Sequence, residues 1–204
     1  MSGDDEPLEE RAFDYARTVA LSDGVLAIAL TLLVLNITVP TLSGAHHGGL
    51  GHQLLDRRSQ VESYALSFAI IAVLWVRHHS LFRVLDRIDG RLTALNLVYL
   101  GFIAFLPYPT RVLGMYPSET AAAVLYAATL LILTIIAALV RVHVARASLL
   151  SRSGHFELDR REHWALAPLI LIASIPIAFL RPDIAEYSWL LLLALPLLTP
   201  ARNP

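Results

Sequence analysis

The chain has 204 residues, of which 56% are hydrophobic, and its mean hydropathy is +0.59. A soluble domain is about 45–50% apolar, so this composition indicates an integral membrane protein. The net charge of −1 provides no basic surface for nucleic acid, and the absence of cysteine excludes disulfides, a thiolate nucleophile and a cysteine-based zinc site.

The chain opens with an acidic, polar arm over residues 1–16 that lacks the basic start and apolar core of a signal peptide. A membrane-spanning helix needs about 20 mostly apolar residues. Six segments meet this requirement approximately: 18–40, 61–76, 92–113, 120–140, 164–180 and 184–198. The fifth contains Pro168 and Pro176, which membrane helices tolerate. We therefore expect one all-α membrane domain of six helices over residues 17–200, followed by a short tail over 201–204.

The arginines predict the orientation of this domain. All 16 basic residues are arginine, and most lie in the N-terminal arm, in the second and fourth loops and in the tail. An even number of spans puts both termini on one side, and positively charged loops stay in the cytoplasm. Both termini are therefore expected to be cytoplasmic. The longest external loop carries His46, His47 and His52, which either bind a metal or are solvated; we assign no metal site there.

The first predicted helix begins RTVALSDGVLAIALTLLVL, from Arg17 to Leu35. On a wheel drawn at about 100° per residue, one apolar stripe contains a single hydroxyl. Its members are Gly24, Ile28, Thr31, Leu32, Leu35 and Val39. Ser22 and Asp23 fall away from the stripe and point at neighbours. The stripe is either an ordinary helix-packing face or a face directed at something else.

Asp23 needs partners, because a buried carboxylate is stable only when it is paired or hydrogen-bonded. Helix 2 ends in WVRHHS and helix 3 carries an amide about one turn from its start, so three helices bring polar groups to one layer. The candidate partners are Trp75, His78, His79 and Asn96. We expect Ser22 and Asp23 to pin helix 1 to helices 2 and 3, either as a structural network or as a proton-relay or substrate site. Arg17 lies on the stripe side of the helix at its cytoplasmic mouth, where an arginine can extend its charged group to the membrane interface.

The sequence contains no HExxH, GxSxG, P-loop or GxGxxG motif, which argues against an enzyme.

These features resemble the transmembrane protein 175 family of potassium-permeable channels, which has an arginine, three residues and then Phe-Ser-Asp-Gly at the start of an apolar helix. Here Arg17 is followed by TVA and by Leu21-Ser22-Asp23-Gly24. The replacement of phenylalanine by Leu21 affects an aromatic packing contact and not the polar positions. The match continues through a Ser-Phe pair, Trp75-x-x-His78-His79-x-x-Phe82, and LNLVYLGFIAFLPYPT with Asn96, Pro107 and Thr110.

The resemblance implies a prokaryotic member with one six-helix unit per chain, assembling as a homotetramer in the cell membrane. Helix 1 would line a central pore, with Ile28, Leu32 and Leu35 at its constriction and Thr31 at the position of the family threonine. The polar network would comprise Arg17, Ser22, Asp23, Trp75, His78 or His79, and Asn96. These pore positions are the residues that the wheel places on one face.

We therefore expect a channel passing K⁺ and other monovalent cations, with no cofactor apart from the permeant ions. Without a TVGYG sequence, a re-entrant carbonyl filter is not available, whereas rings of aliphatic side chains can close a pore by dewetting. The alternatives are a proton-coupled secondary transporter using Asp23 and His78 or His79, and a non-conducting scaffold. A transporter typically shows inverted repeats with broken helices, and we see no such pair.

Overall fold

The computed structural model describes residues 8–40, 50–151 and 166–194, and these are almost entirely helical. In chain order the elements are α1 (Leu8–Leu32), the 3₁₀ turn η1 (Leu33–Asn36), α2 (Leu50–Leu55), α3 (Arg58–Phe82), α4 (Gly90–Phe105), α5 (Pro107–Met115), α6 (Thr120–Arg146), α8 (Leu166–Leu180) and α9 (Pro182–Ala194). The prediction of an all-α protein is confirmed.

Four helical stretches in the described residues are long and apolar enough to cross a membrane: Phe13–Asn36, Arg58–Phe82, Gly90–Met115 and Thr120–Arg146. They correspond to the first four predicted spans. The predicted fifth and sixth spans overlap α8 and α9, which have 15 and 13 residues. A helix of 15 residues is about 22 Å long, shorter than a hydrocarbon core of about 30 Å. The ends of these two predicted spans lie outside the described residues, so six full spans stay a prediction.

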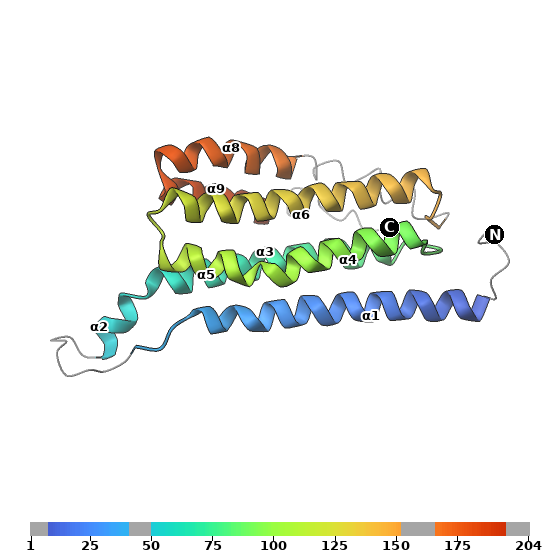
Figure 1. Ribbon diagram of the computed structural model, residues 1–204, viewed down its shortest axis with the longest axis horizontal. Helices are drawn as coiled ribbons and strands as arrows, with labels where there is room; N and C mark the ends of the chain where they lie inside the picture. The colour runs from blue at the N-terminus through green and yellow to red at the C-terminus, as the bar shows by residue number, and fades with distance from the viewer. Residues whose placement is uncertain (1–7, 41–49, 152–165, 195–204) are drawn as a thin grey trace.

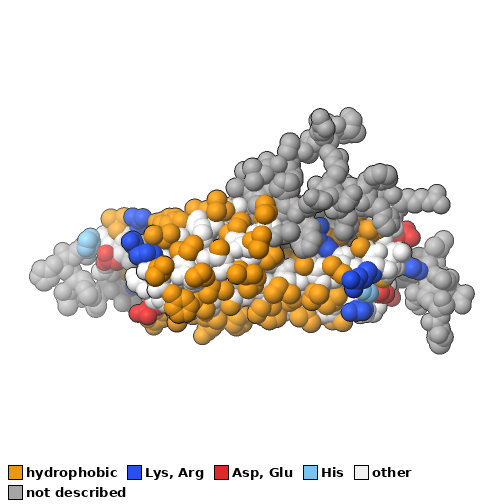
Figure 2. Space-filling view, turned by 90° about the horizontal axis from the view of Figure 1, so that it is seen from above, with side chains coloured by type: hydrophobic (Ala, Val, Ile, Leu, Met, Phe, Trp, Pro, Cys, Tyr) orange, Lys and Arg blue, Asp and Glu red, His pale blue; other side chains and the backbone are white. Residues whose placement is uncertain are grey.

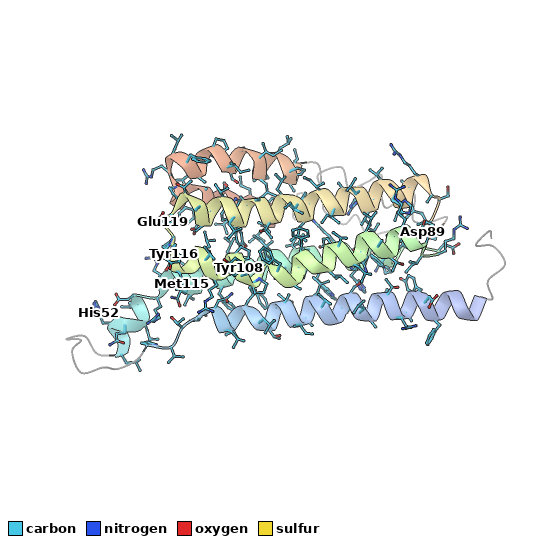
Figure 3. The ribbon with its side chains drawn as sticks, in the orientation of Figure 1. His52, Asp89, Tyr108, Met115, Tyr116 and Glu119 are labelled. Carbon is cyan, nitrogen blue, oxygen red and sulfur yellow. The ribbon has the colours of Figure 1, made fainter. Side chains whose placement is uncertain are left out.

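The long helices lie side by side, with α1 along one edge of the bundle and the α8–α9 pair along the opposite edge (Figure 1). α1 packs against α3 and α4, and α6 packs against α4 and α8. We call the end that carries η1, α2 and α5 the α2 end, and the end where α3 finishes and α4 begins the Asp89 end. Figure 3 shows Asp89 at one end, and His52, Met115, Tyr116 and Glu119 at the other.

Several helices extend beyond the predicted apolar segments. α1 begins at Leu8, well before the predicted start at residue 18, and therefore runs across the expected boundary between the arm and the channel domain. The extra residues, LEERAFDYAR, include many strong helix formers. Hydropathy indicates only the part of a helix that lies in the membrane. The helix propensity of the preceding polar residues allows α1 to begin before that part.

The third predicted span is one stretch of chain but two helices. Pro107 and Pro109 have no N–H to donate, and the helix is interrupted at Leu106, whose N–H is shared between the carbonyls of Phe102 (3.1 Å) and Ile103 (3.2 Å). α5 then continues to Met115. The break at Leu106 follows from the missing proline N–H groups, and membrane helices tolerate prolines of this kind.

The core lies between α1, α3, α4, α5, α6, α8 and α9, and its largest fully buried side chains are Trp189 and Tyr126. Buried hydroxyls join three helices within it, because Ser67 Oγ lies 2.8 Å from Tyr126 Oη and accepts from Thr110 Oγ1 at 2.8 Å. On the visible surface, apolar side chains cover the middle and charged side chains gather at the two ends (Figure 2). An apolar belt between two charged ends is the surface of a protein that is embedded in a bilayer.

Candidate functional site: the exposed face of α1 and the polar layer behind it

The two sides of α1 differ sharply in exposure. Leu26, Ala29 and Leu33 are buried against the other helices. The predicted stripe lies on the other side: Ile28 is 58% exposed and Leu35 is 70% exposed, and Gly24, Thr31 and Leu32 are exposed as well. The residues that the wheel places on one face thus form the face of α1 that the single chain leaves uncovered.

Thr31 is the only hydroxyl on this stripe. Its Oγ1 donates to the carbonyl of Ile28 at 2.9 Å, one turn earlier in the same helix. Because the hydroxyl hydrogen is used in this bond, the lone pairs of the oxygen remain as acceptors on the exposed side. The site can therefore offer an oxygen ligand to a cation, flanked by hydrocarbon from Ile28, Leu32 and Leu35.

A chain of hydrogen bonds holds the opposite side of α1. The Asn96 side chain, on α4, donates its Nδ2–H to Ser22 Oγ at 2.9 Å, and Ser22 donates to the Thr18 carbonyl at 2.8 Å. Asn96 Oδ1 lies 2.9 Å from His78 Nε2, on α3. Ser22 is fully buried and Asn96 is 2% exposed. Three helices are joined through one amide.

Asp23 belongs to a second, separate contact. It accepts a hydrogen bond from the indole N–H of Trp75 at 2.9 Å, and the Trp75 ring stacks on His79 with a centroid separation of 5.4 Å. His78 instead stacks on Phe82 at 4.2 Å and on Tyr99 at 5.7 Å. The sequence left open which histidine pairs with Asp23, and in this structure the direct partner is Trp75.

Arg17 lies apart from both contacts. It is exposed, and its guanidinium carbon sits 5.5 Å from the centre of the Phe13 ring on the same helix. The expected membership of Arg17 in the polar network is therefore not seen within one chain. A cation over an aromatic ring one turn away on the same helix is a favourable exposed contact.

Sequence reasoning missed two polar contacts, one made by α1 and one made by η1. Tyr15, placed in the arm, donates its hydroxyl to the Phe82 carbonyl at 2.8 Å, and Asn36 donates its side-chain N–H to the Pro107 carbonyl at 2.9 Å. Asn36 interrupts the apolar run LTLLVLNITV, which was an available signal. The described residues contain no group of His, Asp and Glu that could hold a metal ion, and His46 and His47 lie outside those residues.

These features define a class: an all-helical membrane protein whose first helix is pinned on one side by polar contacts and exposes an aliphatic face with one hydroxyl on the other. The family model described as "Endosomal/lysosomal potassium channel TMEM175" matches residues 17–107. A potassium channel of Chamaesiphon minutus is 33% identical over 173 residues, covering 82% of this chain and 85% of that one. The chain belongs to the TMEM175 family.

Other relatives match over shorter stretches. A potassium channel of Streptomyces collinus is 42% identical over 106 residues, which is 52% of this chain and 50% of its own length. The zebrafish relative is named an endosomal/lysosomal proton channel and is 29% identical over 61% of this chain and 24% of its own length. A crystal structure of a lysosomal potassium-selective channel TMEM175 homolog from Chamaesiphon minutus superimposes with a TM-score of 0.82 at 30% identity, covering 92% of this chain and 99% of that one. These relatives are named as channels and not as enzymes.

Proposed function

We propose that this protein is a potassium-permeable cation channel in a prokaryotic cell membrane, formed by four copies of the chain around a pore lined by α1. One observation carries the proposal: the stripe containing Ile28, Thr31, Leu32 and Leu35 is uncovered in the single chain, whereas Ser22 and Asp23 hold the opposite side. A single stripe cannot enclose a pore, so several copies must face one axis. The names of the bacterial relatives support potassium as the ion.

The aliphatic part of the stripe would act as a gate. Rings of Ile28, Leu32 and Leu35 present only hydrocarbon to the axis, and a narrow hydrocarbon constriction blocks ions by losing its water. Small outward movements of α1 would wet the constriction. The buried contacts on the other side of the helix set how far α1 can move.

Thr31 would supply the polar element of the pore. It lies between Ile28 and Leu35 along the helix, with its oxygen lone pairs free to accept. A ring of such oxygens replaces part of the hydration shell of an ion. Potassium gives up water more readily than sodium does, so the ring favours potassium modestly. Other monovalent cations are expected to pass as well.

Charge at the two ends supports cytoplasmic termini. The Asp89 end carries Arg77, Arg83, Arg87, Arg91, Arg141 and Arg146, whereas the α2 end carries Arg57, Arg58, Arg111 and Arg181. The more positive end of a membrane protein faces the cytoplasm. The start of α1 lies at the Asp89 end (Figure 1), so we place that end inside and the α2 end outside.

The deciding experiment is a current measurement on the purified protein in planar bilayers, under opposed potassium and sodium gradients. A passive current that reverses near the potassium equilibrium potential supports the channel. A passive current without selectivity retains the pore and removes the role of Thr31. Proton-driven uptake of a solute without passive current would instead support the transporter, with Asp23, His78 and His79 as the coupling site.

Chemical cross-linking of the same preparation tests the assembly. The pore requires a species of four chains, and a protein that stays monomeric in the bilayer would contradict it.

A further inference from the structure

The turn η1, which follows α1, is tied to the rest of the protein at the α2 end by contacts that the proposed function does not use. Asn36 is only 8% exposed, although the preceding residue, Leu35, is 70% exposed. The Asn36 side chain donates to the Pro107 carbonyl at 2.9 Å, next to the break between α4 and α5. Neighbouring residues in a 3₁₀ turn point about 120° apart. The direction of Asn36 therefore sets the direction of Leu35.

A second tie follows two residues later. The Thr38 backbone N–H and its hydroxyl both donate to Gln60 Oε1, at 2.9 Å and 3.0 Å, and Arg57 donates to the Thr38 hydroxyl oxygen. Gln60 is buried, with 9% of its surface exposed. The chain that leaves η1 is thus clamped to the first turn of α3 by one side-chain oxygen.

The hydrogen-bond partners of Asn36 and Thr38 lie where α3 and α5 pack closely against each other, and we call this contact the α3–α5 support. A Cβ placed on Gly114 would lie 2.5 Å from Ser63 Oγ and 2.9 Å from the Gln60 Cα, so the backbones approach as closely as glycine permits. Ser59 Oγ also donates to the Gly114 carbonyl at 2.9 Å. Gln60 and Pro107 therefore belong to a support that cannot shift without breaking this packing.

We propose that Asn36 and Gln60 are positioning residues that fix the rotation of η1, so that Leu35 is held toward the pore axis. The inference rests on the proposed channel function, since it assigns Leu35 to the constriction. The hydrogen bonds of Asn36 and Gln60 anchor one end of the pore-lining segment. The proposed channel can therefore open only if these hydrogen bonds break, or if α1 bends between this end and Ser22. Residues that do not reach the pore thereby set the balance between closed and open states.

Single-channel recording of Asn36→Ala tests the anchor. The expected result is a closed-to-open ratio lowered about tenfold, the effect of losing one buried hydrogen bond, with an unchanged unitary conductance. Because Asn36 acts through Leu35, the substitution should have no further effect in a Leu35→Ala background. Additive effects of the two substitutions would overturn the proposal.

A conservative pair of variants separates positioning from folding. Gln60→Glu retains an acceptor oxygen for Thr38 and faces Arg57, whereas Gln60→Leu keeps the size and removes the acceptor. Only Gln60→Leu should lower the closed-to-open ratio. Thr120→Val is the matched control, because it removes a hydrogen bond to the Ala178 carbonyl at the same end of the protein that involves neither η1 nor the packing of α3 against α5. Equal effects of Gln60→Glu and Gln60→Leu would contradict the assignment.

Amide hydrogen exchange tests the hydrogen bond between Thr38 and Gln60 independently of channel activity. In Gln60→Leu the Thr38 amide should exchange at least about tenfold faster than in the natural protein, and in Gln60→Glu it should not. Unchanged exchange in Gln60→Leu would overturn the anchor even if the channel conducts. If the natural protein passes no current but the exchange changes as expected, the channel function fails and the anchor stands as a structural contact only.

Discussion

Trp75 donates its indole N–H to a carboxylate oxygen of Asp23 across 2.9 Å, and this bond joins α3 to the side of α1 that faces away from the exposed stripe. Asp23 is partly buried and Trp75 is 38% exposed. The bond lies at the border between the packed interior and the surface where a second copy of the chain would stand.

Trp75→Phe should lower the free energy of unfolding by about 1–2 kcal/mol, because it keeps an aromatic ring but removes the indole N–H that donates to a partly exposed carboxylate. Thermal unfolding in detergent measures the change. Trp189→Phe is the matched control, since Trp189 on α9 donates to Ser174 on α8 at 2.9 Å, and because Trp189 is fully buried the loss of stability should be at least as large. We expect Trp75→Phe to alter the current and Trp189→Phe to leave it unchanged. Equal effects of both variants on the current would remove any gating role of the Asp23 contact.

Ile28→Ala combined with Leu35→Ala should increase the open probability, because smaller side chains widen the hydrocarbon constriction and let water enter. Both residues are more than half exposed in the single chain, so the cost to its stability should be small. Single-channel recording gives the result. Leu26→Ala, on the buried side, is expected to destabilise the protein by about 2–5 kcal/mol without wetting the pore. An unchanged conductance and open probability in the double variant would count against the gate.

Thr31→Val should reduce the ratio of potassium to sodium permeability, because valine has the shape of threonine without the oxygen. The reversal potential under bi-ionic conditions measures this ratio. Thr134→Val is the control: Thr134 also donates back along its own helix, at 2.8 Å to the Leu130 carbonyl, but it lies on α6 away from the stripe. A permeability ratio that survives Thr31→Val would place selectivity elsewhere.

The environment of Asp89 leads us to expect that the folded protein loses stability in acid. Burial raises the pKa of Asp89, but hydrogen bonds from the Leu92 backbone N–H and from His143 outweigh that effect, so the pKa lies below its ordinary value. A depressed carboxylate pKa contributes stability above the unfolded-state value of about 3.9, and this is lost as the pH falls through the folded-state pKa.

The unfolding temperature should therefore drop below about pH 4, and the drop should be smaller in Asp89→Asn, which remains a good helix cap without a charge. Asp86→Asn, at an exposed carboxylate of the same connection, serves as the control. Identical acid profiles for Asp89→Asn and the natural protein would contradict this role.

Gly114→Ala should destabilise the protein by about 1–3 kcal/mol, because the added methyl would meet the backbone of Gln60 at 2.9 Å and force α3 and α5 apart. Gly101→Ala is the matched control: it is also a helical glycine, but nothing lies within 4 Å of its Cβ position. Alanine favours a helix over glycine by up to about 1 kcal/mol, so Gly101→Ala should be neutral or stabilising. Thermal unfolding of the two variants compares them directly, and equal effects would argue against close packing at Gly114.

Local patterns predicted the helices well, since apolar runs of sufficient length and a period of 3.6 residues depend on neighbours along the chain. Pro107 signalled a break that we did not assign, because a proline in a membrane helix is compatible with either a kink or an interruption. Trp75 was one of four candidate partners of Asp23, because a carboxylate in an apolar helix requires polar groups of similar depth, and it is the one that contacts Asp23 directly.

What the sequence determined by itself is the class of protein, the first four spans and the stripe on α1, which depend on composition, length and period. The motif from Arg17 to Gly24 pointed to the family through its resemblance to known members. Only the tertiary structure decided that Asp23 pairs with Trp75, that Asn96 joins Ser22 to His78, that Arg17 stays apart, and that Asn36 reaches Pro107. For Ser22 and Asp23, the sequence offered several side chains able to form the same hydrogen bond. The choice among them depends on how helices distant in sequence are rotated and shifted against one another, and packing of the whole bundle sets that rotation.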